Sequence, residues 1–209
     1  MISVTIILVA NEQLRIMQKK QIETFCPTSR QEWRRWLKEN HSLKQSVWLV
    51  CYKKKSNVPT ITYSDAVDEA LCFGWIDSTR KSLDNETFMQ FFCKRKPTSV
   101  WSKINKGKVQ RLIYEGLITQ AGHQSIETAK QNGSWTILDD VEELIIPKDL
   151  EKEFKSKPGS KDFFLSLSKS VKKAILQWLV LAKQQETRQK RISEIAELAS
   201  QKLKPKQFR

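Results

Sequence analysis

Apolar residues follow a strand pattern in the first half of the chain and a helix pattern after Trp101. The run Val47–Tyr52 is apolar throughout and rich in β-branched and aromatic residues, which predicts a buried strand. Two more strands are predicted at Trp75–Lys81 and Thr87–Lys94, on either side of the turn signal Asp84-Asn85. This arrangement predicts an antiparallel hairpin.

Helical spacing appears twice before the hairpin. Ser29 is followed three residues later by Glu32, the spacing of a capping box, and the helix is expected to end at Asn40. A second helix is expected to begin with Ser64 as its cap and to end at Gly74, where a left-handed backbone is often needed.

The C-terminal half is predicted to be helical. Helices are expected over residues 102–114 and 119–133, and Ser170 opens an amphipathic helix with an unbroken apolar stripe. A final helix carries the apolar residues between 192 and 203. The pattern as a whole predicts an α+β fold, in which a small antiparallel sheet of about three strands packs with a mainly helical C-terminal half.

Three regions are expected along the chain. Residues 1–24 form an N-terminal extension, either flexible or an edge strand, residues 25–135 an α+β core, and residues 136–209 a helical region. The apolar run Ile2–Ala10 is too short to span a bilayer and lacks the basic start of a secretory signal. Met17 is an alternative start, which leaves open whether the residues before it belong to the folded protein.

The net charge of the chain says more about its partners than its hydrophobic content does. Of the 209 residues, 39% are hydrophobic and seven are Trp, which is enough for a substantial core. The formal net charge of +14 favours anionic partners, either a small molecule, an acidic macromolecule or nucleic acid. Because lysines are spread along the whole chain, a solvated cationic surface explains the charge equally simply. The oligomeric state cannot be inferred from these features.

Cysteine and histidine usage argues against a metal centre or cofactor. The four cysteines are isolated and none forms a C-x-x-C pair, which is typical of small core residues in a reducing, cytoplasmic compartment. The two histidines, His41 and His123, are far apart in the sequence. We therefore expect no metal ligands, no cofactor and no catalytic set.

Residues 72–78 form the first candidate segment for chemistry. Strand geometry places Trp75, Asp77 and Thr79 on one face, with the acid in line with a tryptophan. A buried carboxylate needs a partner, so an ion pair or a cap for a neighbouring turn explains Asp77 as well as a functional role does.

Residues 94–106 form the second candidate segment. The segment is cationic, carries Trp101 as an aromatic expected to be exposed, and leads into a helix N-terminus, where anions bind. Arg95 adds a planar fork suited to carboxylate or phosphate. The alternative is a connection in which Trp101 packs as a hydrophobic staple and Ser102 caps the helix.

The hairpin brings the two segments together, because the end of its second strand lies beside the start of its first. We therefore predict a ligand site that combines residues of both segments. Its expected members are Trp75, Asp77, Arg95, Ser99, Trp101, Asn105 and Lys106.

Three motifs carry a family resemblance. They are Tyr63-x-x-Ala66-x-x-x-Ala70-Leu71-Cys72-Phe73-Gly74-Trp75-Ile76-Asp77-Ser78, Arg95-x-Pro97-x-Ser99-x-Trp101-Ser102-x-x-Asn105-Lys106 and Ala182-Lys183-x-x-Glu186-Thr187-Arg188-x-x-Arg191-Ile192. In this order they resemble the signatures of the YdeI/OmpD-associated family, also called bacteriocin-protection proteins, from about Cys26 to Arg209. The resemblance implies a bacterial cytoplasmic protein linked to envelope stress and to resistance against bacteriocins or cationic peptides, with no established reaction.

Three functions remain open at this stage. The leading hypothesis is a cytoplasmic binding or regulatory protein in envelope-stress resistance. The second is nucleic-acid binding through a basic helical surface in the C-terminal region, although bundle packing explains those helices too. The third is an enzyme on a small anionic substrate, with Asp77 as acid or base. This ranks lowest because no second catalytic group accompanies Asp77.

Overall fold

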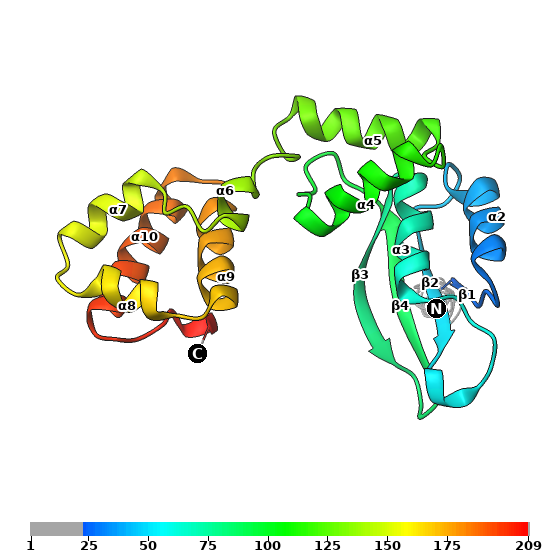
Figure 1. The fold of residues 1–209 in the computed structure, drawn as a ribbon, viewed down its shortest axis with the longest axis horizontal. Coiled ribbons are helices and arrows are strands. Elements are labelled where there is room, and N and C mark those ends of the chain that lie inside the picture. The colour runs from blue at the N-terminus through cyan, green and yellow to red at the C-terminus, as the bar shows by residue number, and fades with distance from the viewer. Residues whose placement is uncertain (1–22, 209) are drawn as a thin grey trace, which may run out of the picture. The chain divides into compact units, whose positions relative to one another are not determined.

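The computed structural model describes residues 23–208 (Figure 1). Most of the predicted N-terminal extension, including Ile2–Ala10 and Met17, lies outside the described residues. The elements follow along the chain as β1 (Thr24–Phe25), α2 (Arg30–Asn40), β2 (Ser46–Tyr52), a 3-10 turn (Lys54–Ser56), α3 (Tyr63–Cys72), β3 (Trp75–Ser82), β4 (Thr87–Lys94), α4 (Lys103–Tyr114), α5 (Gln120–Gln131), α6 (Asp139–Glu142), α7 (Lys148–Lys155), α8 (Ser160–Ser166), α9 (Lys169–Val180), α10 (Gln185–Ser200) and a second 3-10 turn (Lys206–Phe208).

The sheet has four strands in the order β1-β2-β4-β3. Strand β4 pairs antiparallel with both β2 and β3, which confirms the predicted hairpin and the α+β fold. The additional strand is β1, a two-residue segment that pairs parallel with β2. A segment this short shows no alternation, so the sequence pattern did not predict it.

Helix starts differ slightly from expectation. Ser29 caps α2 as predicted, by accepting a hydrogen bond from the backbone N–H of Glu32. Helix α3 begins earlier than expected, because Thr62 rather than Ser64 provides the cap. Helix α9 is capped by Ser168, two residues before the predicted Ser170. In each correction a nearby hydroxyl residue satisfies the first turn instead.

The two faces of the sheet differ. Helices α2 and α3 cover one face, where Trp33 of α2 lies 5.4 Å from Phe92 of β4 between ring centroids. Trp36 of α2 meets Trp75 of β3 edge-on at 5.8 Å. Strand β2 was predicted to be buried throughout, but its residues alternate between buried and half-buried. The other face, with Trp48, is therefore only partly covered by the described residues, and we call it the open face.

Two buried acids of α3 hold the neighbouring helices. Glu69 is only 2% exposed and accepts charged hydrogen bonds from Arg30 and Arg34 of α2. Asp68, 3% exposed, is likewise bonded by two cations of α4, which are Lys108 and Arg111. Removing one partner of such a buried pair is costly, so these acids are structural.

Two glycines allow the end of α3 to approach α5 closely. Gly74 has a φ of +71°, and a Cβ there would lie 2.9 Å from the carbonyl oxygen of Ala121. At Gly122 a Cβ would lie 2.4 Å from the carbonyl oxygen of Cys72. That same carbonyl accepts hydrogen bonds from the backbone and hydroxyl of Thr119. Gly74 thus ends α3 as predicted.

Contacts divide the chain into two compact units. Among the described residues, the first contains residues 23–96 and 108–126, and the second contains residues 97–107 and 127–208. The second unit has its own core of residues from α6 to α10, including the adjacent rings of Phe154 and Phe164. The expected division into residues 25–135 and 136–209 stays a prediction.

Candidate functional site

In the first unit, Asp77 is held by two hydrogen-bond donors. The Tyr63 hydroxyl donates to Oδ2 of Asp77 at 2.7 Å, and the Gln90 side-chain amide approaches the same oxygen at 3.4 Å. Gln90 is 3% exposed and also donates to the carbonyl of Ser78. Burial, followed by the hydrogen bond to Asp77, raises the pKa of Tyr63 to about 12. Tyr63 therefore remains a donor over the physiological range.

Arg95 lies at the end of β4, beside the start of β3. Its backbone N–H donates to the carbonyl of Gly74 at 3.0 Å, and Lys94 pairs with Trp75 in the ladder. Burial lowers the pKa of the Arg95 guanidinium to about 10, and the negative charge of Asp77 opposes that shift. The hairpin thus brings Trp75, Asp77 and Arg95 together, although Trp75 is fully buried.

The expected alternation along β3 ends after Asp77. The register with β4 shifts between Asp77 and Arg80, so the strand is irregular at Ser78 and Thr79. Thr79 consequently does not share the face of Trp75 as predicted, but lines a hollow on the open face. An irregularity of this kind interrupts the period of two on which the prediction rested.

The remaining predicted site residues belong to the second unit. Trp101 is 1% exposed, which corrects its predicted exposure, and its ring lies 5.0 Å from that of Trp135. Lys106 pairs with Asp139 and lies 5.4 Å from the Trp135 ring centroid. Ser102 accepts a hydrogen bond from the backbone N–H of Asn105, so it caps α4 as predicted.

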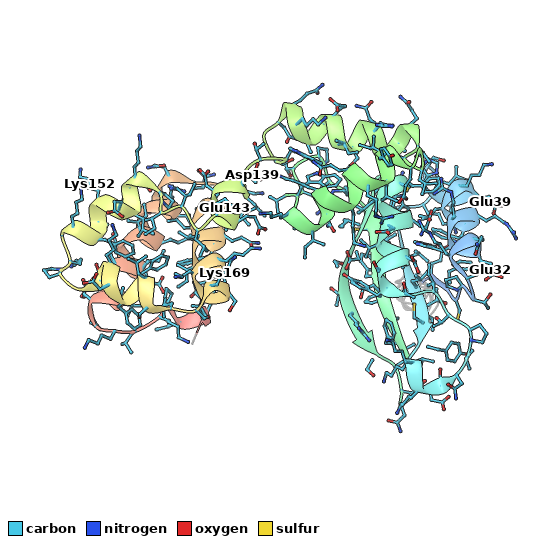
Figure 2. The ribbon with its side chains drawn as sticks, in the orientation of Figure 1. Glu32, Glu39, Asp139, Glu143, Lys152 and Lys169 are labelled. Carbon is cyan, nitrogen blue, oxygen red and sulfur yellow. The ribbon has the colours of Figure 1, made fainter. Side chains whose placement is uncertain are left out.

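Acidic residues at the ends of α6 pair with lysines of α4. Figure 2 labels Asp139 and Glu143 at the two ends of this short helix. Glu143 pairs with Lys103 at 3.0 Å. Asp139 pairs with Lys106. The helix start that was predicted to attract anions is therefore already in contact with carboxylates of the same unit. That Ser99, Trp101, Asn105 and Lys106 share one ligand site with the hairpin residues stays a prediction.

Arginines of the third motif fasten helices to one another. Arg188 forms a forked pair with Asp149 of α7, at 2.6 and 3.0 Å, and approaches the carbonyl of Leu179. Hydrogen bonding by Arg188 is the main cause of a lowered pKa at Asp149. Arg191 donates to the carbonyl of Trp178 and lies over its ring at 4.7 Å. Contacts between helices therefore account for the two arginines of the third motif.

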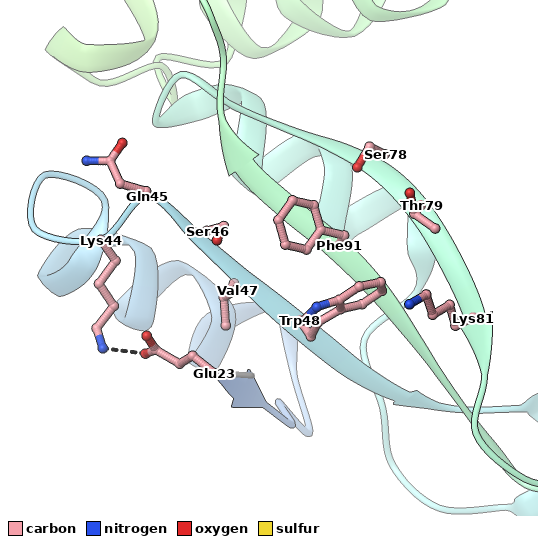
Figure 3. Close-up of a pocket in the computed structure, with 10 residues that line it drawn as sticks. All are labelled: Glu23, Lys44, Gln45, Ser46, Val47, Trp48, Ser78, Thr79, Lys81 and Phe91. Atoms are coloured by element: carbon pink, nitrogen blue, oxygen red, sulfur yellow. Dashed lines mark hydrogen bonds and ion pairs between the residues drawn. The ribbon is translucent and has the colours of Figure 1, made fainter. Parts of the chain in front are cut away.

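A hollow on the open face was not found by sequence reasoning. It has a volume of about 630 Å³ and lies over β2, β4 and β3 (Figure 3). It is lined by Glu23, Lys44, Gln45, Ser46, Val47, Trp48, Ser78, Thr79, Lys81 and Phe91. The volume falls in the range of small-ligand sites.

The hollow combines aromatic rings with a cation. Trp48 and Phe91 occupy opposite positions on adjacent strands, and their ring centroids are 5.0 Å apart at 60°. The ammonium group of Lys81 lies 5.0 Å from the centroid of the Trp48 ring. At the rim, Lys44 pairs with Glu23 (Figure 3). The spacing of Trp48 and Phe91 in sequence gives no sign of this, because their meeting depends on the β2–β4 register.

Neither a metal cluster nor a spanning helix appears in the described part of the chain. Among residues 23–208, no three His, Cys, Asp or Glu side chains are grouped so that they could hold a metal ion. No helix within those residues has both the length and the apolar character needed to cross a membrane.

Comparison with known proteins gives two family matches, which cover separate parts of the chain. Residues 25–125 match a domain of unknown function (DUF8412). No curated protein and no solved structure matches the chain. Over residues 26–142, the expected resemblance to the YdeI/OmpD-associated family stays a prediction. Residues 143–202 match the family described as "Bacteriocin-protection, YdeI or OmpD-Associated", and over that range the resemblance is shown.

Proposed function

We propose that this protein binds an anionic, ring-bearing ligand on the open face of its sheet. In this proposal the binding contributes to cytoplasmic protection against bacteriocins or cationic peptides. The observation that carries it is the grouping of Trp48, Phe91 and Lys81 in one hollow. Half-buried rings stack on a planar ligand, while the neighbouring ammonium group attracts its negative charge.

Charge favours an anionic ligand over direct capture of the toxic peptide. The formal net charge of the chain is +14, and like charges repel on approach. A cationic peptide therefore meets an unfavourable field, whereas an anion is attracted. Protection would then act through an anionic partner inside the cell.

Two further observations support parts of this proposal. The match of residues 143–202 to the bacteriocin-protection family supports a role in resistance. The cysteines at 26, 51, 72 and 93 are all free thiols, which supports a reducing compartment such as the cytoplasm.

A complementation experiment tests the proposal. A bacterial strain lacking the gene is supplied with the wild-type chain, with Trp48→Ala or with Tyr114→Ala, and challenged with a panel of bacteriocins and cationic peptides. Tyr114 is 94% exposed on α4 of the same unit and serves as the matched aromatic control. The wild type and Tyr114→Ala should restore resistance, whereas Trp48→Ala should not. Equal sensitivity with and without the gene across the panel would reject the protective role.

A further inference from the structure

We infer that the ligand of the open face is single-stranded nucleic acid, an inference that rests on the function proposed above. Trp48 and Phe91 would provide a platform for stacked bases, and Lys81 would contact the phosphate backbone. Single-stranded nucleic acid matches both the rings and the charge of this one surface.

The aromatic pair lies on one side of the sheet, where bases can reach both rings. Trp48 of β2 and Phe91 of β4 face each other in the antiparallel register, so both rings project from the same side of the sheet. Both side chains are half-buried, which fixes their position and leaves ring surface accessible to solvent. Every base has a π-face, so such a platform binds a strand with little dependence on its sequence.

Cations and hydroxyls surround the rings. Lys81 is exposed on β3, an outer strand of the sheet, with its ammonium group over Trp48. Lys44 pairs with Glu23, and the side chains of this pair are 36% and 42% exposed. Solvent weakens a pair this exposed, so Lys44 can exchange Glu23 for a phosphate at small cost. Ser46 and Thr79 supply hydroxyl donors for phosphate or base edges.

A single strand fits this surface better than a duplex does. In a duplex the faces of the bases are already stacked on one another, whereas single-stranded bases can be splayed onto aromatic side chains. The C-terminal helices, which were the surface predicted from sequence, are less suited. Their less exposed cations Lys173 and Arg188 are engaged by Glu142 and Asp149.

Fluorescence anisotropy tests the inference with a labelled oligothymidylate of about 12 nucleotides, within the site sizes usual for such proteins. Unlabelled duplex and inorganic polyphosphate serve as competitors of similar charge. The single strand should bind, Trp48→Ala and Phe91→Ala should each weaken binding by roughly tenfold or more, and Trp48→Phe should restore most of it. Lys81→Ala should weaken binding. It should also lower the slope of log K against log[salt] by about one, because one phosphate contact is lost.

Matched controls separate stacking from general charge. Tyr114→Ala removes an exposed aromatic elsewhere in the same unit, and Lys38→Ala removes an exposed cation of α2, on the covered side of the sheet. Both should leave the affinity unchanged. Photocrosslinking of 4-thiothymidine to the wild type, mapped by mass spectrometry to peptides containing residues 48 and 91, gives a readout that needs no variant to fold.

The outcomes distinguish this inference from the proposed function. Crosslinks elsewhere, or polyphosphate that binds as well as the strand while Trp48→Ala has no effect, would overturn nucleic-acid recognition. Loss of polyphosphate binding in Lys81→Ala would still support an anionic ligand at this face. If neither polymer binds at low salt, nucleic-acid recognition fails, and the proposed function is then decided by the complementation experiment with Trp48→Ala.

Discussion

The candidate aromatic and charged side chains have different roles in the two units. In the second unit, Trp101 is buried against Trp135, and Arg188 is engaged with Asp149, so the residues of the motifs stabilise the fold. In the first unit, Trp48 and Phe91 lie half-exposed on a sheet face and belong to no motif. The comparison teaches that a motif can mark a fold while the surface available to a ligand lies elsewhere in the chain.

The largest effect should separate the two faces of the sheet. Trp75 is fully buried on the covered face, so Trp75→Ala should lower the free energy of unfolding by about 3–5 kcal/mol. Trp48→Ala on the open face should lower it by only about 1 kcal/mol. Urea denaturation followed by circular dichroism measures both. Similar losses for the two variants would show that the open face is part of a closed core.

The close approach of the end of α3 to α5 should give the next largest effect. Gly122→Ala would place a Cβ 2.4 Å from the carbonyl of Cys72, which should cost about 2 kcal/mol or more. Gly107 of α4 is the matched control, because a Cβ there meets nothing within 4 Å. Gly107→Ala should be neutral or stabilise by about 0.5–1 kcal/mol. Thermal unfolding of the two variants checks this, and a stable Gly122→Ala would contradict the close approach.

A smaller effect should appear in the second unit. Arg188→Met removes the forked pair with Asp149 and should destabilise by about 1 kcal/mol, a value reduced for partial exposure. Lys190→Met, at a far more exposed pair with Glu186, should change little.

This effect should also depend on pH. The folded-state pKa of Asp149 is lowered, so its contribution to stability is present above the unfolded pKa of about 3.9 and is lost as pH falls through the folded value. Urea denaturation at several acidic pH values should therefore show the wild type and Arg188→Met converging. A constant difference down to the lowest pH would contradict the role given to this pair.

The smallest effect concerns Tyr63, whose side chain is half-exposed. Tyr63→Phe should cost about 0.5 kcal/mol at neutral pH by removing the hydrogen bond to Asp77. The folded pKa of about 12 exceeds the unfolded value of about 10, so this stabilisation is present below the unfolded value and disappears as pH rises through the folded one. Ultraviolet titration of tyrosinate should show one high-pKa group that is absent from Tyr63→Phe.

Local signals made much of the fold predictable from sequence. The Ser29–Glu32 capping spacing, the glycine at position 74 and the hairpin around Asp84 each depend on residues close in the chain, and each appears where the pattern indicates. The cap of α3 does not follow from the local pattern alone, because Thr62 competes with Ser64 for the same helix start. Element type follows from local chemistry, while boundaries depend on which neighbouring hydroxyl forms the cap.

The candidate site was less predictable, because its features depend on tertiary contacts. Trp101 looked exposed beside charged residues, but Trp135, distant in sequence, covers it. The run Val47–Tyr52 is apolar on both faces, so its pattern could not show that one face remains open. The meeting of Trp48 with Phe91 requires the strand register, and the burial of Glu69 requires the arginines of α2.

The division of α4 has a practical consequence for dissecting the protein. Residues 97–107 belong to the second unit although 19 residues of the first unit, 108–126, separate them from the rest of it. A fragment beginning at residue 127 would lack Trp101 and leave the ring of Trp135 without that packing partner. A fragment ending at residue 126 would carry the exposed indole of Trp101 as a hydrophobic liability. Neither half can be excised by a single cut, so a fragment meant to fold as the second unit must retain both of its segments.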